Sequence, residues 1–387
     1  MTRIAQQTPG PNSANEISLS DLDRVQDVRD KHEQVSRLLE SRGWDALLLQ
    51  RPSNFSWMTS GGDSSGRGMG EPLAALFITV DSRLVIANNC NSPQIFDEEI
   101  PQLGFSLKER PWTEPPHVLL DDLCRSRVVA SDTGDRETVD ASAAIRELRL
   151  KLTSLERARM RIVGRHVAHA VEATARTLEI GQTEAEIAGQ LSHRLIHRQV
   201  TPVQLQVMAD GRGDRHRHWS YGGDPLRKWC VISAIGSRWG VCVAATRTVC
   251  FGQPPQDVLE AFQSAAMVEA TGIFFSRPDT PMSKLFARVS RIYEKFGHDR
   301  QWRLCDQGEI IGYEPCDLPI SPTTHVPLAA NMAVHWHPTI GPAKLGDTIL
   351  IAENGYEPLR PTEGWPQLGV AVKGVSIECP DLLIREP

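Results

Sequence analysis

The stretch Gly308-Glu309-Ile310-Ile311-Gly312-Tyr313 opens the region that decides the fold, which extends to Asp347. It is followed by Cys316-Asp317-Leu318-Pro319 and by His335-Trp336-His337-Pro338. Polar residues flanked by Gly alternate there with Ile, Val and Leu, and this alternation predicts short strands that present side chains to one face. A sheet displays a catalytic cluster in this way. We therefore expect the functional residues on these strands and on one partner segment upstream.

Length and charge narrow the class of protein. The chain has 387 residues, enough for two domains, and 40% of them are hydrophobic, which is ample for sizeable cores. Its 42 basic and 48 acidic side chains give a formal net charge of -6, so nothing attracts it generally to nucleic acid or to a membrane. We expect a soluble protein that acts on a small molecule or peptide, with no nucleic-acid partner and no membrane partner.

The cysteines and the first residues of the chain exclude further classes. No apolar run approaches the roughly 20 residues that span a bilayer, and residues 1–15 contain no apolar secretory core, so a cytoplasmic location is expected by default. The eight cysteines are scattered without a Cys-x-x-Cys pair. Neither a zinc ribbon nor a disulfide framework is therefore expected.

Hydrophobic periodicity predicts a mixed series of helices and strands. Helices are expected at residues 22–42, 140–148, 154–178, 185–198, 256–275 and 281–296. Strands are expected at residues 45–50, 73–80, 83–88, 124–132 and 204–209, with a hairpin over 230–251.

The arrangement resembles the creatinase/aminopeptidase P superfamily, the pita-bread peptidases. That family carries Gly-His-x-x-Gly, then His-Asp or His-Glu, then Pro. Here Gly308 to Gly312 keeps the frame with Glu309 in the His position, and Cys316-Asp317 stands where the His-acid pair belongs, followed by Pro319. Thr246-Arg247-Thr248 matches the family's Thr-Arg-Thr tail at the end of the predicted hairpin.

The resemblance, which spans roughly residues 20 to 365, implies an α+β protein. A disordered lead-in over residues 1–19 would precede a smaller N-terminal creatinase-like α/β domain over 20–150 and a C-terminal pita-bread domain over 151–387. Relatives are commonly dimers, so a homodimer is expected. Whether the neighbouring subunit contributes residues to the pocket is left open.

The resemblance also implies five ligand positions for a dinuclear metal centre. Matched one by one, these positions are Ser233, Ala244, Glu309, His337 and Gly346. None carries the ligand type of the family, and Ala and Gly cannot bind metal, so two ligands remain where a catalytic ion needs at least three. We therefore expect no metal ligands and no cofactor. The adjacent Asp347 is an alternative assignment for the last position.

Creatinase, within this superfamily, works without metal and uses a His as its proton carrier. The matching residue here is His218, with His216 as the alternative, and an imidazole can give and take one proton during C–N cleavage. Glu309 and His337 would point into one pocket as an acid–base pair, in which the carboxylate fixes the His tautomer. The other interpretation is that this pair only fills and neutralises the space of a lost metal.

Five further residues are candidates for binding substrate: Asp306, Tyr313, Cys316, Asp317 and Trp336. Asp317 would bind a positive group of the substrate. Cys316 is also a candidate nucleophile if His218 or His337 lowers its pKa, although a lone Cys is more often inert packing.

Three hypotheses of function follow from the resemblance. The first is a metal-independent, creatinase-like hydrolase of a C–N bond in a small amide or guanidino compound. The second is a catalytically silent pita-bread binding protein. The third is an Xaa-Pro peptidase of the aminopeptidase or dipeptidase type with an atypical metal site.

Overall fold

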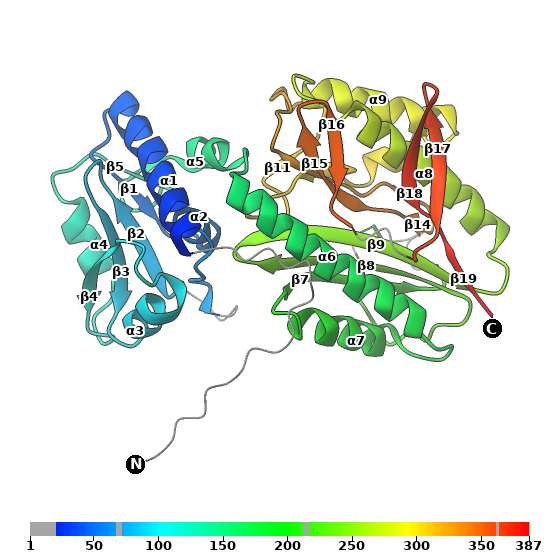
Figure 1. Ribbon diagram of the computed structural model, residues 1–387, viewed down its shortest axis with the longest axis horizontal. Helices are drawn as coiled ribbons and strands as arrows, with labels where there is room; N and C mark the ends of the chain where they lie inside the picture. Colours follow the sequence, from blue (N-terminus) through cyan, green and yellow to red (C-terminus); the bar gives the residue numbers. More distant parts are fainter. Residues whose placement is uncertain (1–20, 67–71, 212–215, 218, 361–363, 387) are drawn as a thin grey trace, which may run out of the picture.

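The computed structural model describes residues 21–66, 72–211, 216–217, 219–360 and 364–386. It contains two separate large sheets, one in each half of the chain, which lie side by side with α6 (Ser154–Thr177) beginning between them (Figure 1). The expected α+β class is confirmed. The predicted lead-in over residues 1–19 and the candidate His218 lie outside the described residues.

The amino-terminal half is built on a six-stranded sheet in the order β4-β3-β2-β1-β5-β6. Its central strand β1 is an unbroken apolar run that is buried along its whole length, as expected of a strand covered on both faces. The strands are β1 (Ala46–Leu49), β2 (Ala74–Ile78), β3 (Arg83–Asn88), β4 (Ser106–Arg110), β5 (Val129–Ser131) and β6 (Val139–Asp140). The helices are α1 (Asp21–Arg42), α2 (Pro52–Met58), α3 (Ser92–Gln94), the π-helical turn η2 (Ile95–Glu99), α4 (Pro116–Cys124) and α5 (Ser142–Arg149).

The strand expected over residues 124–132 is wrong in its first half. Helix α4 ends at Cys124, and only Val129–Ser131 form a strand. Leu120 and Leu123 are buried at helical spacing, so burial of one apolar face favours the helix up to this point.

The carboxy-terminal half is built on a nine-stranded sheet that runs β11-β10-β12-β15-β9-β8-β7, with β16 paired to β15 and β19 paired to β9. Its strands are β7 (Thr201–Ala209), β8 (Trp229–Arg238), β9 (Val241–Phe251), β10 (Gly308–Ile310), β11 (Leu318–Pro319), β12 (Ala333–Trp336), β15 (Asp347–Ala352), β16 (Gly355–Pro358) and β19 (Leu383–Arg385). Two small hairpins complete it: β13 (Thr339–Ile340) with β14 (Ala343–Lys344), and β17 (Gln367–Val372) with β18 (Val375–Pro380).

Helices cover this sheet. Helix α6 packs along β8 and β9, and α7 (Glu184–Ile196) packs on β7 (Figure 1). Both begin with a capping box, Thr153 with Glu156 and Thr183 with Glu186, which satisfies the free amides of the first turn. Helices α8 (Gln256–Phe275) and α9 (Met282–Lys295) pack on each other, and α8 contacts the two small hairpins; the short 3-10 turn η4 (Gln301–Arg303) follows.

Helix α8 corrects one expectation. Among the described residues it alone is long and apolar enough to cross a membrane by length and composition, although the sequence was expected to hold no such run. However, 67% of its apolar window is buried inside the protein, where it packs as a core helix.

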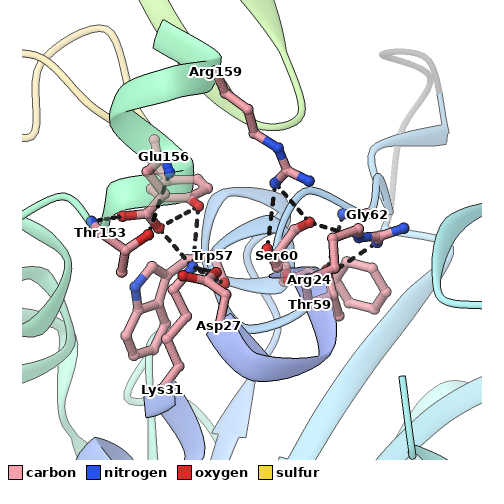
Figure 2. A network of polar contacts seen from close by, with 12 residues as sticks. Arg24, Asp27, Lys31, Trp57, Thr59, Ser60, Gly62, Thr153, Glu156 and Arg159 are labelled. Carbon is pink, nitrogen blue, oxygen red and sulfur yellow. Dashed lines mark hydrogen bonds and ion pairs between the residues drawn. The ribbon is translucent and has the colours of Figure 1, made fainter. Parts of the chain in front are cut away.

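A buried ion cluster joins the two halves (Figure 2). The Lys31 Nζ of α1 lies 2.6 Å from Asp27 Oδ2 and 2.6 Å from Glu156 Oε1 of α6, and it donates to the Trp57 carbonyl at 2.9 Å. The Tyr313 hydroxyl donates to the same Glu156 oxygen at 2.6 Å. The strand region after Gly312 is thereby tied to α1 as well as to α6.

A second cluster surrounds Arg149, at the end of α5. Its guanidinium donates to Asp317 Oδ1, with Nε at 2.9 Å, and lies 3.0 Å from Glu314 Oε1. It also donates to Asn54 Oδ1 of α2. Both clusters therefore hold the 313–317 segment against the amino-terminal half of the chain.

Candidate functional site

Two neighbouring strands bring one carboxylate and two imidazoles together. Glu309 on β10 pairs directly with His335 on β12, and His337 lies two residues further along. Since alternate residues of an extended chain face the same side, all three side chains point to one face of the sheet. Glu309 Oε1 lies 2.6 Å from His335 Nδ1, and Glu309 Oε2 lies 2.5 Å from His337 Nε2.

Burial and mutual charge decide how this cluster is protonated. Burial alone would raise the pKa of Glu309, but the two imidazoles outweigh it and lower the pKa to about 2. Burial lowers the pKa of His335 in spite of the adjacent carboxylate, so this ring is neutral at pH 7. Its Nε2 is buried and has no hydrogen-bond partner among the described residues.

The cluster forms one wall of a pocket of about 130 Å³. Two basic side chains, Arg217 and Lys344, line the same pocket. The buried Lys344 amine donates to Gln206 Oε1 at 2.6 Å, and Arg217 donates to the Gly341 carbonyl at 2.8 Å. The lining also contains two carboxylates, Glu309 and Asp306. Apart from the imidazoles, the acidic and basic side chains of the pocket are therefore equal in number.

The family's dinuclear metal centre does not fit the residues at its five positions. The Ser233 hydroxyl accepts a hydrogen bond from Thr246 at 2.8 Å, and Ala244 offers no ligand atom. A Cβ at Gly346 would lie 3.1 Å from His335 Nε2, so the imidazole occupies the space into which a longer side chain at 346 would extend. Two ions would lack most of the anionic oxygens that hold them.

Asp347 is not a substitute for the missing last ligand. Its carboxylate lies 2.9 Å from Arg247 Nη1 and also contacts Arg360. Asp347 on β15 pairs with Ala245 on β9. The residues next to each of them along the strand face the pocket, so Asp347 and Ala245 face the other way. Asp347 therefore belongs to a buried charge cluster on the opposite face of the sheet.

One group of potential ligands does remain. Glu309, His335 and His337 each offer a ligand atom within 4.8 Å of the others. Matching the sequence to the family counted only Glu309 and His337 and did not include His335. The absence of metal ligands therefore stays a prediction.

The five candidate substrate-binding residues separate into two groups. Asp306 and Cys316 line the pocket, and Asp306 Oδ2 lies 4.0 Å from His337 Nε2. Tyr313 and Asp317 lie in the two buried clusters between the halves instead, committed to Glu156 and Arg149 respectively. Trp336 lies on the opposite face of β12, where its indole N–H donates to Ser276 at 3.1 Å.

Cys316 has the wrong electrostatic surroundings for a nucleophile. Burial and the neighbouring carboxylates of Glu309 and Asp306 raise the pKa of its thiol to about 12. The thiolate is therefore scarce at neutral pH.

The other candidate proton carrier, His216, is exposed and does not line the pocket. The sequence reasoning also missed several pocket residues, among them His335, Arg217 and Lys344. For His335 a signal existed, because His335 and His337 are two apart on a predicted strand and must share a face.

Comparisons with known proteins agree with this fold. The model of metallopeptidase family M24 matches residues 158–378, more than half of the chain. An uncharacterized peptidase of Staphylococcus haemolyticus is 24% identical over 355 residues, covering 84% of this chain and 97% of that protein. The dimethylsulfoniopropionate lyase of Roseovarius nubinhibens is 21% identical over 397 residues, covering 89% of this chain and 87% of the lyase.

Among solved structures, the prolidase from Pyrococcus horikoshii aligns with a TM-score of 0.75 at 16% identity, covering 86% of this chain and 99% of the prolidase. The expected likeness to the creatinase/aminopeptidase P superfamily is thereby confirmed for the fold. With the family match over the carboxy-terminal half, the chain belongs to metallopeptidase family M24.

Proposed function

We propose that this chain is a hydrolase of a C–N bond in a small amide, dipeptide or guanidino compound, acting at the pocket of Glu309, His335 and His337. The observation that carries the proposal is a single ionised carboxylate in contact with two imidazoles at a pocket wall. Groups that hold and pass protons in this way are typical of acid–base catalysis. The proposal is supported by the family, and by relatives named as a peptidase and a prolidase.

The size and charge of the pocket restrict the substrate. At about 130 Å³ it is smaller than the roughly 300–1,000 Å³ of typical ligand sites, so it admits a small molecule or the end of a larger one. Arg217 and Lys344 add positive charge to the lining that contains Glu309. They suit a substrate that carries a carboxylate or develops negative charge on a carbonyl oxygen.

Hydrolysis adds water to the carbon of the C–N bond and transfers one proton to the leaving nitrogen. His337 would accept the proton of the attacking water and pass it to the leaving nitrogen. Glu309, which its pKa of about 2 keeps ionised, would stabilise the imidazolium through its contact with Nε2. His335 would orient the carboxylate from its other side.

The test is turnover of a panel of dipeptides, including Xaa-Pro, small amides and guanidino acids, with products followed by mass spectrometry. Glu309→Gln and His337→Asn should each lower kcat/KM by about 100-fold or more, the scale of a lost acid–base group. His193→Asn, an exposed residue of α7, is the matched control and should leave turnover unchanged. Absence of turnover across the panel, or turnover that survives Glu309→Gln, would reject the proposal.

Metal-independent turnover, as in creatinase, is a second candidate form of the same activity. It is favoured by the residues at three of the family's ligand positions, Ser233, Ala244 and Gly346, which supply no carboxylate. In this form activity persists after exhaustive chelation. A silent binding protein is the remaining alternative, and one confirmed substrate would exclude it.

The partner and location of the protein are part of the proposal. We propose a small-molecule substrate, a homodimer, and a cytoplasmic protein without nucleic-acid or membrane partners. Light scattering of the purified chain tests the dimer directly.

A further inference from the structure

We infer that Glu309, His335 and His337 form a binding site for one divalent transition-metal ion, in which His335 is a ligand that the five-ligand set of the family does not contain. The inference rests on the geometry of these three side chains. It does not require that the proposed hydrolysis be correct.

The three donors are already gathered around one point. One ligand atom of each lies within 4.8 Å of the other two, and all three side chains are buried on adjacent strands of one sheet. Ligands at the usual 2.0–2.2 Å from an ion are roughly 3 to 3.5 Å apart. Small side-chain rotations would therefore suffice, with the ion replacing the present contacts of Glu309 to the two rings.

The other nitrogen of His335 is not tied to any neighbour in the described part of the chain, so the ring is held only through its contact with Glu309. Nε2 is buried and has no hydrogen-bond partner among the described residues, although a buried polar atom normally has one. Its neighbours cannot satisfy it, because the nearby Thr246 hydroxyl donates to Ser233. A movement of the ring toward an ion would consequently break no hydrogen bond other than the one to Glu309.

The residue at 346 makes this arrangement possible. A Cβ there would stand 3.1 Å from His335 Nε2, a tighter contact than most Cβ atoms make. Gly346 thus leaves the space in which the His335 ring lies.

The donor set determines the class of ion. Two imidazoles and one carboxylate are the ligands of many catalytic zinc sites and of non-haem Fe(II) sites, whereas Mg²⁺ and Ca²⁺ prefer oxygen alone. The Lys344 amine is directed to Gln206 Oε1 rather than to the cluster, and Asp306 Oδ2 lies 4.0 Å from His337 Nε2. Ser233 and Ala244 offer nothing for a second ion, so the stoichiometry is one.

The test is direct binding of Zn²⁺ and Co²⁺ to the chelator-treated full chain. Isothermal titration and elemental analysis should give one ion per chain, and bound Co²⁺ should show the visible absorption of a low-coordinate site. His335→Asn should weaken binding by about 100-fold or more, the loss expected for a ligand rather than a supporting residue. The control His193→Asn should bind like the parent chain.

Folding is checked separately, by thermal unfolding of each metal-free variant, and His335→Gln serves as a second variant if His335→Asn does not fold. No binding by the parent chain, two ions per chain, or equal affinity in the folded His335 variants would each overturn the inference. Because the readout is binding, failure here leaves hydrolysis in its metal-free form intact. Binding without turnover would instead remove the proposed hydrolase and keep the metal site.

Discussion

Replacing Lys31 by Met removes the ammonium that lies 2.6 Å from each of two buried carboxylates in the cluster of Figure 2. Met keeps most of the volume of the Lys stem, so the change isolates the ammonium. The side chains of Lys31, Asp27 and Glu156 are at most 4% exposed. After the substitution both carboxylates remain buried, with the Tyr313 hydroxyl as a partner for Glu156.

The expected loss follows from this burial. Removing one partner of a buried ion pair costs about 3–5 kcal/mol, because the other partner stays desolvated without compensation. Burial raises the pKa of Asp27, but Lys31, together with hydrogen bonds from Thr153 and Ser60, more than reverses this and leaves it below its usual value of 3.8. A lowered carboxyl pKa contributes stability above that value and loses it as the pH falls. The difference between parent and variant should therefore be larger at pH 7 than at pH 4.

The assay is urea unfolding followed by tryptophan fluorescence at both pH values. Arg37→Met is the matched control, because it breaks an ion pair of the same helix at 3.2 Å whose side chains are 73% and 67% exposed. It should cost at most about 1 kcal/mol. A Lys31→Met variant that loses no more than this control, or whose deficit grows on acidification, would refute the reasoning.

Three further predictions concern other groups. Burial raises the pKa of Glu269 to about 8 in the folded chain. The neutral carboxyl therefore favours the folded state below about pH 4.5, and this contribution is lost as the pH rises toward 8. Glu269→Gln should flatten the pH dependence of the thermal unfolding temperature, and an unchanged profile would contradict the raised pKa. Gly346→Ala should destabilise the chain by about 1–3 kcal/mol through overpacking against His335, as measured by urea unfolding, whereas Gly189→Ala on α7, with no atom within 4 Å of its added Cβ, should not. Cys316 and Cys90 are both exposed, so they differ in electrostatic surroundings rather than in access. With a thiol pKa of about 12, Cys316 should react with iodoacetamide at pH 7.5 more slowly than Cys90 in peptide mapping, and equal rates would show that its surroundings do not suppress the thiolate.

Local patterns sufficed for the long helices and for the long strands of the carboxy-terminal sheet. The helix over Ser154–Thr177 and the hairpin of β8 and β9 were predicted from hydrophobic periodicity and agree with the structure within a few residues. The expected strand at 124–132 is shorter in the structure, because Cys124 ends a helix whose apolar side, Leu120 and Leu123, is buried in the sheet domain, and residues 125–128 form neither helix nor strand. That choice depends on tertiary packing, which a short window does not contain.

The site was predicted in part, for a reason that the strand geometry makes clear. Matching family positions identified Glu309 and His337 but passed over His335, which occupies no ligand position of the family. Alternation along β12 places His335 and His337 on the pocket face and Trp336 on the other face. Strict use of the two-residue period would therefore have selected His335 as a candidate site residue in place of Trp336. The commitment of Asp317 to Arg149 spans 168 residues and had no signal in the sequence.

The two anchors of the 313–317 segment limit how far this chain can be shortened. Tyr313 and Asp317 are fixed by clusters that need residues before position 150, while Pro315 and Cys316 between them line the pocket. A fragment trimmed to the part that matches the family, residues 158–378, would expose Tyr313 and Asp317 to water and release the pocket wall that they bracket. The minimal working unit is consequently the two halves together, even though only one of them carries the imidazoles.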